Sequence, residues 1–528
     1  MYLNDVQTAP DVAHPSSGPV QFGRQPLTIE DICAVATGSR AAALDQSEAY
    51  RAYIQSGHAF LEDMLKDNGV IYGVTTGYGD SCTVAIPADQ VAELPLHITR
   101  FHGCGLGRIL NHEEARAVIA ARLASLAQGH SGVRYVLLER LLWLLEKDIT
   151  PLIPAEGSVG ASGDLTPLSY IGALLVGERD ALYQGEIRPA QEIYKELGVV
   201  PLTLQPKEGL ALMNGTAVMT ALACLAYKRA DYLGRLSSRL TALAVMVMKG
   251  NAGHFDERLF RFKPHPGQSQ VAARIRSDLK GWAERHADNR LQDRYSLRCA
   301  PHVIGVLEDS LPLMRQFIET ELNSANDNPI IDAEEKALLH GGHFYGGHIA
   351  FAMDSLKNCI ANLADLMDRQ MALLVDTRYN NGLPSNLSAA DEERASINHG
   401  FKAVQIGMSA WAAEALKNTM PASVFSRSTE CHNQDKVSMG TIAARDCLRN
   451  LDLSEQVAAA LVLALTQAVS IRKGNGGLQE DISAAVTEFY TSVSSWFEVV
   501  REDRPLEGDL RRCIKDIQAQ TWRLYDEE

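Results

Sequence analysis

The sequence predicts a mostly α-helical protein, in which a long central helical bundle is joined to a loop-rich N-terminal domain. Three observations favour this fold class. Apolar residues recur at spacings of three and four over long stretches, alternating strand patterns are sparse, and glycine-rich segments separate the helical stretches. Because long helices with apolar faces must pack on one another, a bundle follows.

The bundle is predicted from four helical stretches. The longest apolar series begins at Ile349 and ends at Leu374, which indicates a helix of about 28 residues, or roughly 40 Å at 1.5 Å per residue. A second series runs from Leu233 to Val247, and two further helices are expected over 398–419 and 440–471.

Three parts are expected along the chain. Residues 1–25 are rich in Pro, Ser and Gly, which is typical of a flexible arm. Residues 26–220 would form the loop-rich N-terminal domain, and residues 221–528 the central and C-terminal helical bundle.

Composition limits the possible partners. The 528 residues carry a formal charge of −15, which disfavours binding to nucleic acid or to an anionic membrane surface. The longest apolar run, Val457 to Leu465, is too short for a membrane span. Nine cysteines without a CxxC pair argue against a zinc ribbon and suit a reducing cytoplasm.

Chemistry is expected in four glycine-rich stretches between the helices, because loops held by a rigid scaffold often carry function. These stretches cover residues 72–80, 101–107, 156–164 and 340–347.

The segment Gly-Ser-Val-Gly-Ala-Ser-Gly-Asp at 157–164 is the most informative of them. Taken alone it is typical of a turn before a helix that begins near Leu165, with Asp164 as N-cap. A serine nucleophile is a second possibility, but the segment is not GxSxG and the sequence pattern predicts no strand before it.

A third interpretation comes from a family resemblance. The stretch GSVGASGDLTPLSYIGALLVGE resembles the signature of the aromatic amino acid ammonia-lyases and related aminomutases, which have an ammonia-lyase/fumarase-like fold. In that family Ala-Ser-Gly cyclises to the electrophile 4-methylideneimidazol-5-one (MIO). The resemblance therefore implies that Ala161, Ser162 and Gly163 form MIO and that no external cofactor is needed. Gly163 lacks a Cβ, as the attacking amide requires, and Ser162 has a hydroxyl that can leave as water.

Further segments resemble family motifs in the same order along the chain. Tyr72, in a Gly-rich stretch, matches the catalytic base, and Asn214, in Met-Asn-Gly-Thr, matches the residue beside the MIO ring. Taken alone, these segments would predict turns. Asn328 would lie on the side of the substrate carboxylate, and Phe344 would pack against the MIO ring.

Gln292, Tyr295 and Arg298 are spaced so that a helix would place them roughly on one side. A surface helical turn would show the same spacing. By the resemblance, Arg298 binds the substrate carboxylate, which suits its planar guanidinium, and Tyr295 lies near the reacting atoms.

Two positions bear on the substrate. Glu430 and Gln434 match the phenylalanine and tyrosine branches, whereas histidine ammonia-lyases have Glu at the second position. Phe101 and His102 match the ring-selectivity pair but form a hybrid of the Phe-Leu, His-Leu and Ser-His pairs of the three branches. His102 could pair with a phenolic hydroxyl, which favours tyrosine.

The resulting hypothesis is an ammonia-lyase that converts L-tyrosine to trans-4-coumarate and ammonia, as a cytoplasmic homotetramer whose sites combine residues of several subunits. Phenylalanine or histidine as substrate, and a MIO-dependent 2,3-aminomutase, remain alternatives. So does a metal-dependent hydrolase that uses His340, His343 and His348, although their spacing fits no helical ligand motif and the family places no metal there.

Overall fold

The computed structural model describes residues 18–67, 69–282, 291–474 and 483–525. By their contacts, the residues fall into two compact units that alternate along the chain. Unit 1 comprises Met1–Gly157, Leu165–Ala217 and Leu322–His343, and unit 2 comprises Ser158–Asp164, Val218–Glu321 and Phe344–Glu528. The three-part division expected from the sequence stays a prediction, because compact units need not fold separately.

Unit 1 consists of helices of 6 to 19 residues and small sheets. Its helices are α1 (Ile29–Thr37), α2 (Glu48–Lys66), α3 (Leu94–Phe101), α4 (His112–Leu126), α5 (Tyr135–Glu146), α6 (Leu165–Leu175), α7 (Ala190–Glu196) and α8 (Glu208–Met213), with the 3₁₀ turn η1 (Gly79–Thr83). Its strands are β1 (Val20–Phe22), β2 (Ala42–Leu44), β3 (Leu106–Ile109), β4 (Thr150–Pro151), β5 (Pro154–Glu156), β6 (Asp180–Tyr183), β7 (Glu186–Pro189), β8 (Ile330–Asp332) and β9 (Ala337–Leu339).

Helix α4 lies at the centre of unit 1. Its residues from Glu114 to Leu126 are all buried, and it packs against α1, α5 and α8. The helix begins at a capping box, in which Asn111 and Glu114 satisfy each other's backbone N–H groups.

The sheets of unit 1 are small. β1 and β2 pair in parallel, whereas β3–β5, β4–β6–β7 and β8–β9 pair antiparallel. Val20 and Phe22 of β1 are buried, so the ordered part of unit 1 includes residues that the sequence pattern assigned to the arm of residues 1–25. Residues 1–17 of the expected arm lie outside the described residues.

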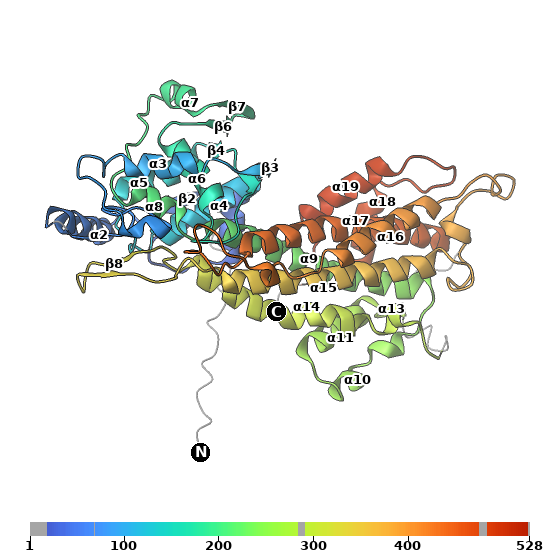
Figure 1. Ribbon diagram of the computed structural model, residues 1–528. Coiled ribbons are helices and arrows are strands. Elements are labelled where there is room, and N and C mark those ends of the chain that lie inside the picture. The colour runs from blue at the N-terminus through green and yellow to red at the C-terminus, as the bar shows by residue number, and fades with distance from the viewer. Residues whose placement is uncertain (1–17, 68, 283–290, 475–482, 526–528) are drawn as a thin grey trace, which may run out of the picture. The chain divides into compact units, whose positions relative to one another are not determined.

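Unit 2 is a bundle of long helices (Figure 1). The long members are α9 (Ala217–Val247), α14 (Ala300–Leu322), α15 (Gly347–Leu374), α16 (Lys402–Lys417) and α17 (Gly440–Gly474). The shorter elements are α10 (Glu257–Arg261), α11 (Pro266–Asp278), α13 (Tyr295–Arg298), α18 (Ala484–Ser494), α19 (Glu507–Gln518), η2 (Ala252–Phe255), η3 (Ser385–Leu387) and η4 (Ala422–Phe425).

The helical stretches predicted from apolar spacing are confirmed. α15 has the expected 28 residues, and α9 and α17 extend beyond the predicted series. Helix α16 is shorter than expected, since the chain between residue 398 and Phe401 is not helical. The mostly α fold class is therefore confirmed.

Helix α17 is the core of unit 2. All residues from Val457 to Leu465 are buried, and the helix packs along α15, α16 and α19. By length and composition alone it could cross a membrane, but 83% of its apolar window is buried inside the protein, as in a core helix.

Because the bundle core is tightly buried, a substitution that leaves a cavity there should lower the free energy of unfolding substantially. Leu363 in α15 is fully buried, so Leu363→Ala is expected to lower the free energy of unfolding by about 2–5 kcal/mol, as measured by chemical denaturation. Val200→Ala is the control, because Val200 is 79% exposed and should change this free energy by less than about 0.5 kcal/mol. Equal losses in the two variants would contradict the packing described.

Candidate active site

The segment Ser158–Asp164 forms a tightly curled loop within unit 2. Gly160, Ser162 and Gly163 all have left-handed backbones, with φ of 75°, 50° and 78°. A Cβ on Gly160 would collide with Ser438 Oγ, so this position requires glycine. The Ala161–Gly163 stretch thus lies in a turn that bends the chain back on itself.

A buried carboxylate anchors this loop. Asp164 is completely buried and accepts hydrogen bonds from Ser158 Oγ (2.9 Å), the Met219 backbone N–H (2.9 Å) and Thr441 Oγ1. Burial raises the pKa of Asp164, although the hydrogen bonds oppose the shift. These contacts join the end of the loop to the beginnings of α9 and α17.

Three long helices begin at the loop. Besides the Met219 contact near the start of α9, the Met439 N–H, just before α17, donates to Val159 O at 3.0 Å. A Cβ on Gly440 would lie 3.3 Å from Gly346 O, which places the start of α15 beside that of α17. The positive ends of three helix dipoles therefore meet here, which stabilises anions and strengthens an electrophile placed there.

The Glu430–Gln434 segment reaches the same loop. Gln434 donates from Nε2 to Ser162 Oγ at 3.3 Å, whereas Glu430 is exposed. The turn between them is held by backbone hydrogen bonds that join Thr429 and Gln434 in both directions. Glu430, Cys431 and His432 all have positive φ, an uncommon conformation for three successive residues that are not glycine.

Phe344 lies three residues before α15 begins and is half-buried. It therefore lies close in sequence to the helix start that borders the loop.

Tyr72 lies in a separate turn of unit 1. Its hydroxyl oxygen accepts a hydrogen bond from the Gly79 backbone N–H at 2.8 Å. A donor at this oxygen stabilises the phenolate form, which a tyrosine base requires. Nearby Tyr78 is different: burial, with a smaller contribution from Tyr72, raises the pKa of Tyr78.

Phe101 and His102 stand at the end of α3, with ring centroids 4.4 Å apart. Phe101 is 58% exposed. Burial lowers the pKa of His102 to about 4, so its imidazole is neutral at neutral pH. Within the described part of the chain, His102 makes a ring contact and a backbone hydrogen bond but no hydrogen bond through its imidazole.

Asn214 follows the last residue of α8 and is 2% exposed. Its buried Oδ1 has no hydrogen-bond partner among the residues that the structure describes, so it can accept one from a bound group. Asn328, also in unit 1, accepts a hydrogen bond from the Gly341 N–H through Oδ1 at 2.9 Å.

Helix α13 holds Tyr295 and Arg298, whose guanidinium lies 4.7 Å from the Tyr295 ring centroid. Gln292 is exposed and precedes the helix, so the helical spacing considered for the three residues holds only for Tyr295 and Arg298. Arg298 lines a pocket of about 480 Å³ with Lys263, so two cations face this space. The remaining lining residues are His254, Leu259, Phe260, Cys299 and His302.

Arg298 and Ser162 do not meet within one chain. Ser296 O, in α13, accepts a hydrogen bond from Gln370 Nε2 (2.9 Å), near the end of α15, whereas the loop adjoins the start of that helix. At 1.5 Å per residue, these two points of α15 are roughly 35 Å apart. Residues of unit 2 that the resemblance assigns to one site thus lie near opposite ends of α15.

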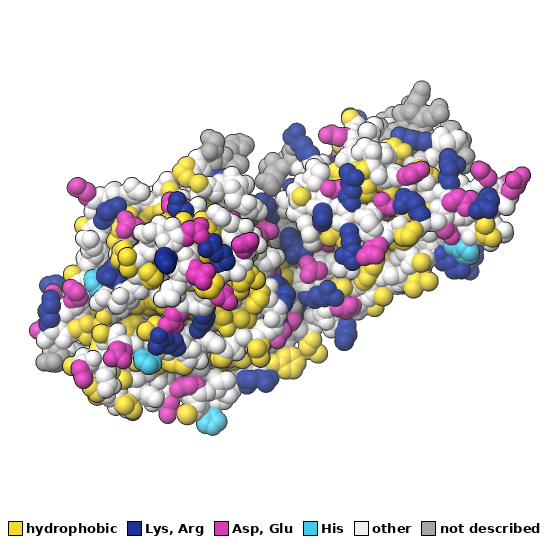
Figure 2. All heavy atoms as spheres, turned by 90° about the horizontal axis from the view of Figure 1, so that it is seen from above, with side chains coloured by type: hydrophobic (Ala, Val, Ile, Leu, Met, Phe, Trp, Pro, Cys, Tyr) yellow, Lys and Arg dark blue, Asp and Glu magenta, His cyan; other side chains and the backbone are white. Residues whose placement is uncertain are grey.

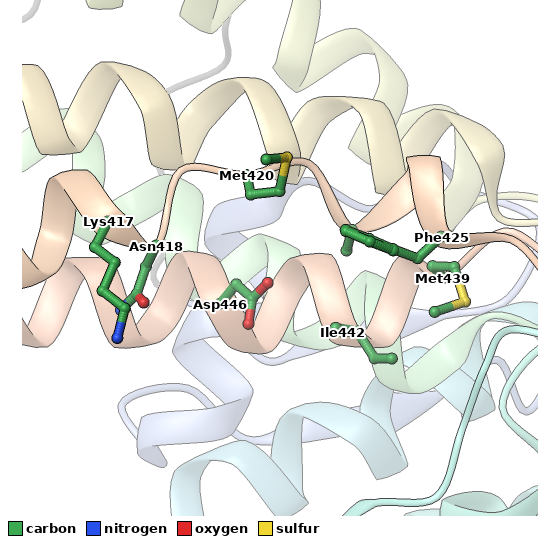
Figure 3. Close-up of a pocket in the computed structure, with 8 residues that line it drawn as sticks. Lys417, Asn418, Met420, Phe425, Met439, Ile442 and Asp446 are labelled. Carbon is green, nitrogen blue, oxygen red and sulfur yellow. The ribbon is translucent and has the colours of Figure 1, made fainter.

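A second, mainly apolar pocket of about 450 Å³ borders the start of α17 (Figure 3). Met439, just before α17, and Ile442, within it, line one side, and Met420 and Phe425 line it from the segment that follows α16. Met420 and Phe425 are 62% and 48% exposed, so this apolar surface is open in the single chain.

The histidines considered as metal ligands show no such arrangement. Among the described residues, no group of three or more His, Cys, Asp or Glu side chains is placed to hold a metal ion. His348 instead packs edge-on against Phe317, with ring centroids 5.0 Å apart.

Sequence reasoning missed two residues that hold the loop and a buried ion pair of unit 1. Thr441 and Ser158 bind Asp164, and Lys207 forms a buried ion pair with Asp327. Thr441 lies at the start of a predicted helix and Ser158 in the loop segment itself, so both positions were visible. Their hydrogen bonds to Asp164 could not be predicted from the sequence. Thr441 is far from Asp164 along the chain, and Ser158 is one of several serines and threonines near it.

Comparison with known proteins agrees with this arrangement. The family described as aromatic amino acid lyase matches residues 27–495. The chain is 36% identical to the tyrosine ammonia-lyase of Cereibacter sphaeroides, over 94% of this chain and 97% of that protein. It is 35% identical to a histidine ammonia-lyase of Geobacillus sp., over 89% and 91% of the two chains.

The crystal structure of tyrosine aminomutase from Streptomyces globisporus superimposes with a TM-score of 0.87 at 34% identity, covering 95% of this chain and 97% of that one. The matched family spans nearly all of the folded chain, including the curled loop and the residues around it. The chain therefore belongs to the aromatic amino acid lyase family, whose members include ammonia-lyases and aminomutases.

Proposed function

We propose that this enzyme removes ammonia from L-tyrosine to give trans-4-coumarate. The observation that carries the proposal is the curled Ala161–Gly163 turn, which lies where three helices begin and within hydrogen-bond reach of Gln434. Family membership supports carbon–nitrogen lyase chemistry, and the preference for tyrosine rests on residues of this chain.

Residues 161–163 fit the formation of MIO. Ser162 has a left-handed backbone, which turns the chain between Ala161 and Gly163, and Gly163 presents no Cβ. The positive helix ends would make such a ring a stronger electrophile, because they stabilise the negative charge that it gains when a nucleophile adds. MIO would supply an electrophile for the substrate amine, and no external cofactor enters the proposal.

Tyr72 is proposed as the general base that takes the β-proton of the substrate. The Gly79 N–H would stabilise its phenolate, as a tyrosine acting in this role requires. Gln434 and Glu430 would position the amine side, with Gln434 already directed at Ser162.

Arg298 would bind the substrate carboxylate through its planar guanidinium, and the second cation of its pocket, Lys263, supports an anionic ligand. Tyr295 would lie beside the reacting atoms. The remaining proposed substrate-binding residues are Gln292, Asn328, Asn214 and Phe344. Of these, Asn214 offers the buried acceptor described above.

The ring preference rests on His102. A neutral buried imidazole without a hydrogen-bond partner in the described chain can pair with a phenolic hydroxyl, and a ring without the hydroxyl would leave it unsatisfied. Phenylalanine is the nearest alternative. Histidine is also possible, given the histidine ammonia-lyases among the relatives, but Gln434 offers its imidazole no anion.

A tyrosine 2,3-aminomutase is a second candidate, favoured by the close structural similarity to the enzyme from Streptomyces globisporus. The two reactions share their first half and differ in whether ammonia is released or returned to the β-carbon. Product analysis separates them, because a lyase accumulates 4-coumarate with free ammonia and a mutase accumulates β-tyrosine.

We further propose that the enzyme is a homotetramer. The separation of Arg298 from Ser162 along α15 supports sites that combine different subunits. Hydrophobic side chains also gather on the face of unit 1 that Figure 2 shows. Three large hydrophobic residues of unit 1, Val70, Val84 and Leu106, are more than half exposed. A cytoplasmic location is supported by nine cysteines that are all free.

The first prediction concerns the polypeptide mass. Cyclisation of Ala161–Gly163 removes two water molecules, so intact-mass analysis should find the wild-type chain lighter by that amount. Ser162→Ala should show the full mass of its sequence and lose nearly all activity while keeping its helical circular dichroism. A wild-type chain of undehydrated mass would refute the cofactor.

The second prediction concerns the ring. His102→Leu should lower kcat/KM for tyrosine by roughly 10- to 100-fold and leave kcat/KM for phenylalanine equal or higher, because the hydroxyl loses its partner. Formation of the conjugated acids can be followed by absorbance with each substrate. Equal losses on both substrates would contradict the role of His102.

The third prediction concerns the shared site. Ser162→Ala and Arg298→Ala should each be inactive, but hetero-oligomers co-expressed from both should regain about a quarter of the wild-type activity. One pairing in four would bring both native residues into a site that draws on two chains. Absence of recovery in proven hetero-oligomers would show that a single chain supplies both residues.

A further inference from the structure

Unit 1 contains a fully buried ion pair that the proposed chemistry does not use. Lys207 Nζ lies 2.5 Å from Asp327 Oδ2, and both side chains are inaccessible to solvent. Burying two charges is costly, and such a pair is often no more stabilising than an apolar one. Its presence therefore calls for a role beyond stability.

The two charged residues stand beside the two asparagines of unit 1. Lys207 immediately precedes α8, the single short helix that ends at Met213, just before Asn214. Asp327 immediately precedes Asn328, and its second oxygen, Oδ1, accepts the Asn328 backbone N–H at 2.7 Å. One ion pair thus joins the segment that carries Asn214 to the segment that carries Asn328.

Lys207 makes this contact from a strained backbone conformation. Its φ and ψ are 76° and −32°, a region that residues with a Cβ rarely adopt. Glycine would relieve the backbone but could not supply the ammonium. Burial lowers the pKa of Lys207, and the carboxylate of Asp327 opposes that shift, so the contact helps to keep the lysine charged.

A second contact ties the same two segments. Gly215, next to Asn214, has φ of 150°, and a Cβ there would lie 2.6 Å from Asn326 O. Asn326 in turn accepts a hydrogen bond from Ser125 Oγ through Oδ1 at 2.9 Å. The Asn214 and Asn328 segments are thus fixed to each other on both sides, with α4 as their support.

We propose that the Lys207–Asp327 pair is a positioning device that sets the spacing of Asn214 and Asn328 for binding of the amino acid substrate. The inference rests on the proposed function, in which both asparagines contact the substrate or its surroundings. Lys207 and Asp327 touch no reacting atom. They act through the two asparagines, and their loss should affect substrate binding more than the chemical step.

The test is a double variant, Lys207→Met with Asp327→Asn. It removes both charges together and keeps an oxygen to accept the Asn328 N–H. The variant should fold, show the dehydrated mass and retain much of kcat, but KM for tyrosine should rise roughly 10- to 100-fold, because small displacements of binding groups are costly. The inhibition constant of trans-4-coumarate should rise by a similar factor.

A matched control is the pair Arg239–Asp278 of unit 2, which is also buried, with 2.7 Å between its charged atoms. Arg239→Met with Asp278→Asn is expected to alter thermal stability while leaving KM and the inhibition constant unchanged. Should the Lys207 double variant not fold, Asp327→Asn alone provides the measurement, since a buried lysine can shed its proton when its partner is neutral.

The outcomes separate the two proposals. A folded double variant, or a folded Asp327→Asn variant, with wild-type KM and inhibition constant would overturn the positioning role while the wild-type enzyme remains active on tyrosine. A wild-type enzyme that forms neither 4-coumarate nor β-tyrosine would overturn the proposed function, and the positioning role with it.

Discussion

The buried carboxylate of Asp164 is the contact on which the arrangement of the site depends. It accepts hydrogen bonds from Ser158 within the loop, from the backbone near the start of α9, and from Thr441 near the start of α17. A carboxylate without water needs such donors, and the first turns of helices supply backbone N–H groups that have no partner inside the helix. The same contacts hold the Ala161–Gly163 turn where helix dipoles make the local potential positive. The helix starts therefore both anchor the turn and set the potential around it.

The length of the bundle has a second consequence. A helix of 28 residues separates its ends by roughly 40 Å, so groups attached near opposite ends of α15 cannot act on the same small molecule within one chain. The curled loop adjoins one end and α13 lies near the other. Long helices thus favour shared sites in an oligomer. The exposed apolar pocket beside α17 would then be covered by another subunit.

Unit 1 is built differently, because the proposed binding residues Asn214 and Asn328 lie outside its helices. The Lys207–Asp327 pair and the close approach at Gly215 replace the rigidity that a continuous helix would give. In the positioning role proposed above, the charged pair favours one geometry, because separating its members would leave unpaired charges in a water-free interior. Lys207 has a strained backbone conformation, as expected when a tertiary contact and not local preference sets the backbone torsions.

The sequence by itself determined the long helices, since the 3.6-residue period of apolar positions follows from local geometry. The apolar series from Ile349 to Leu374 lies within α15, which begins two residues earlier, at Gly347. The sequence also determined the family, through the signature around Ala161–Gly163. Only the tertiary structure decided that Thr441 holds Asp164, that Gln434 reaches Ser162, and that Arg298 lies far from that serine. These pairings join residues separated by many positions, and no local pattern encodes them, because they arise from the packing of whole helices.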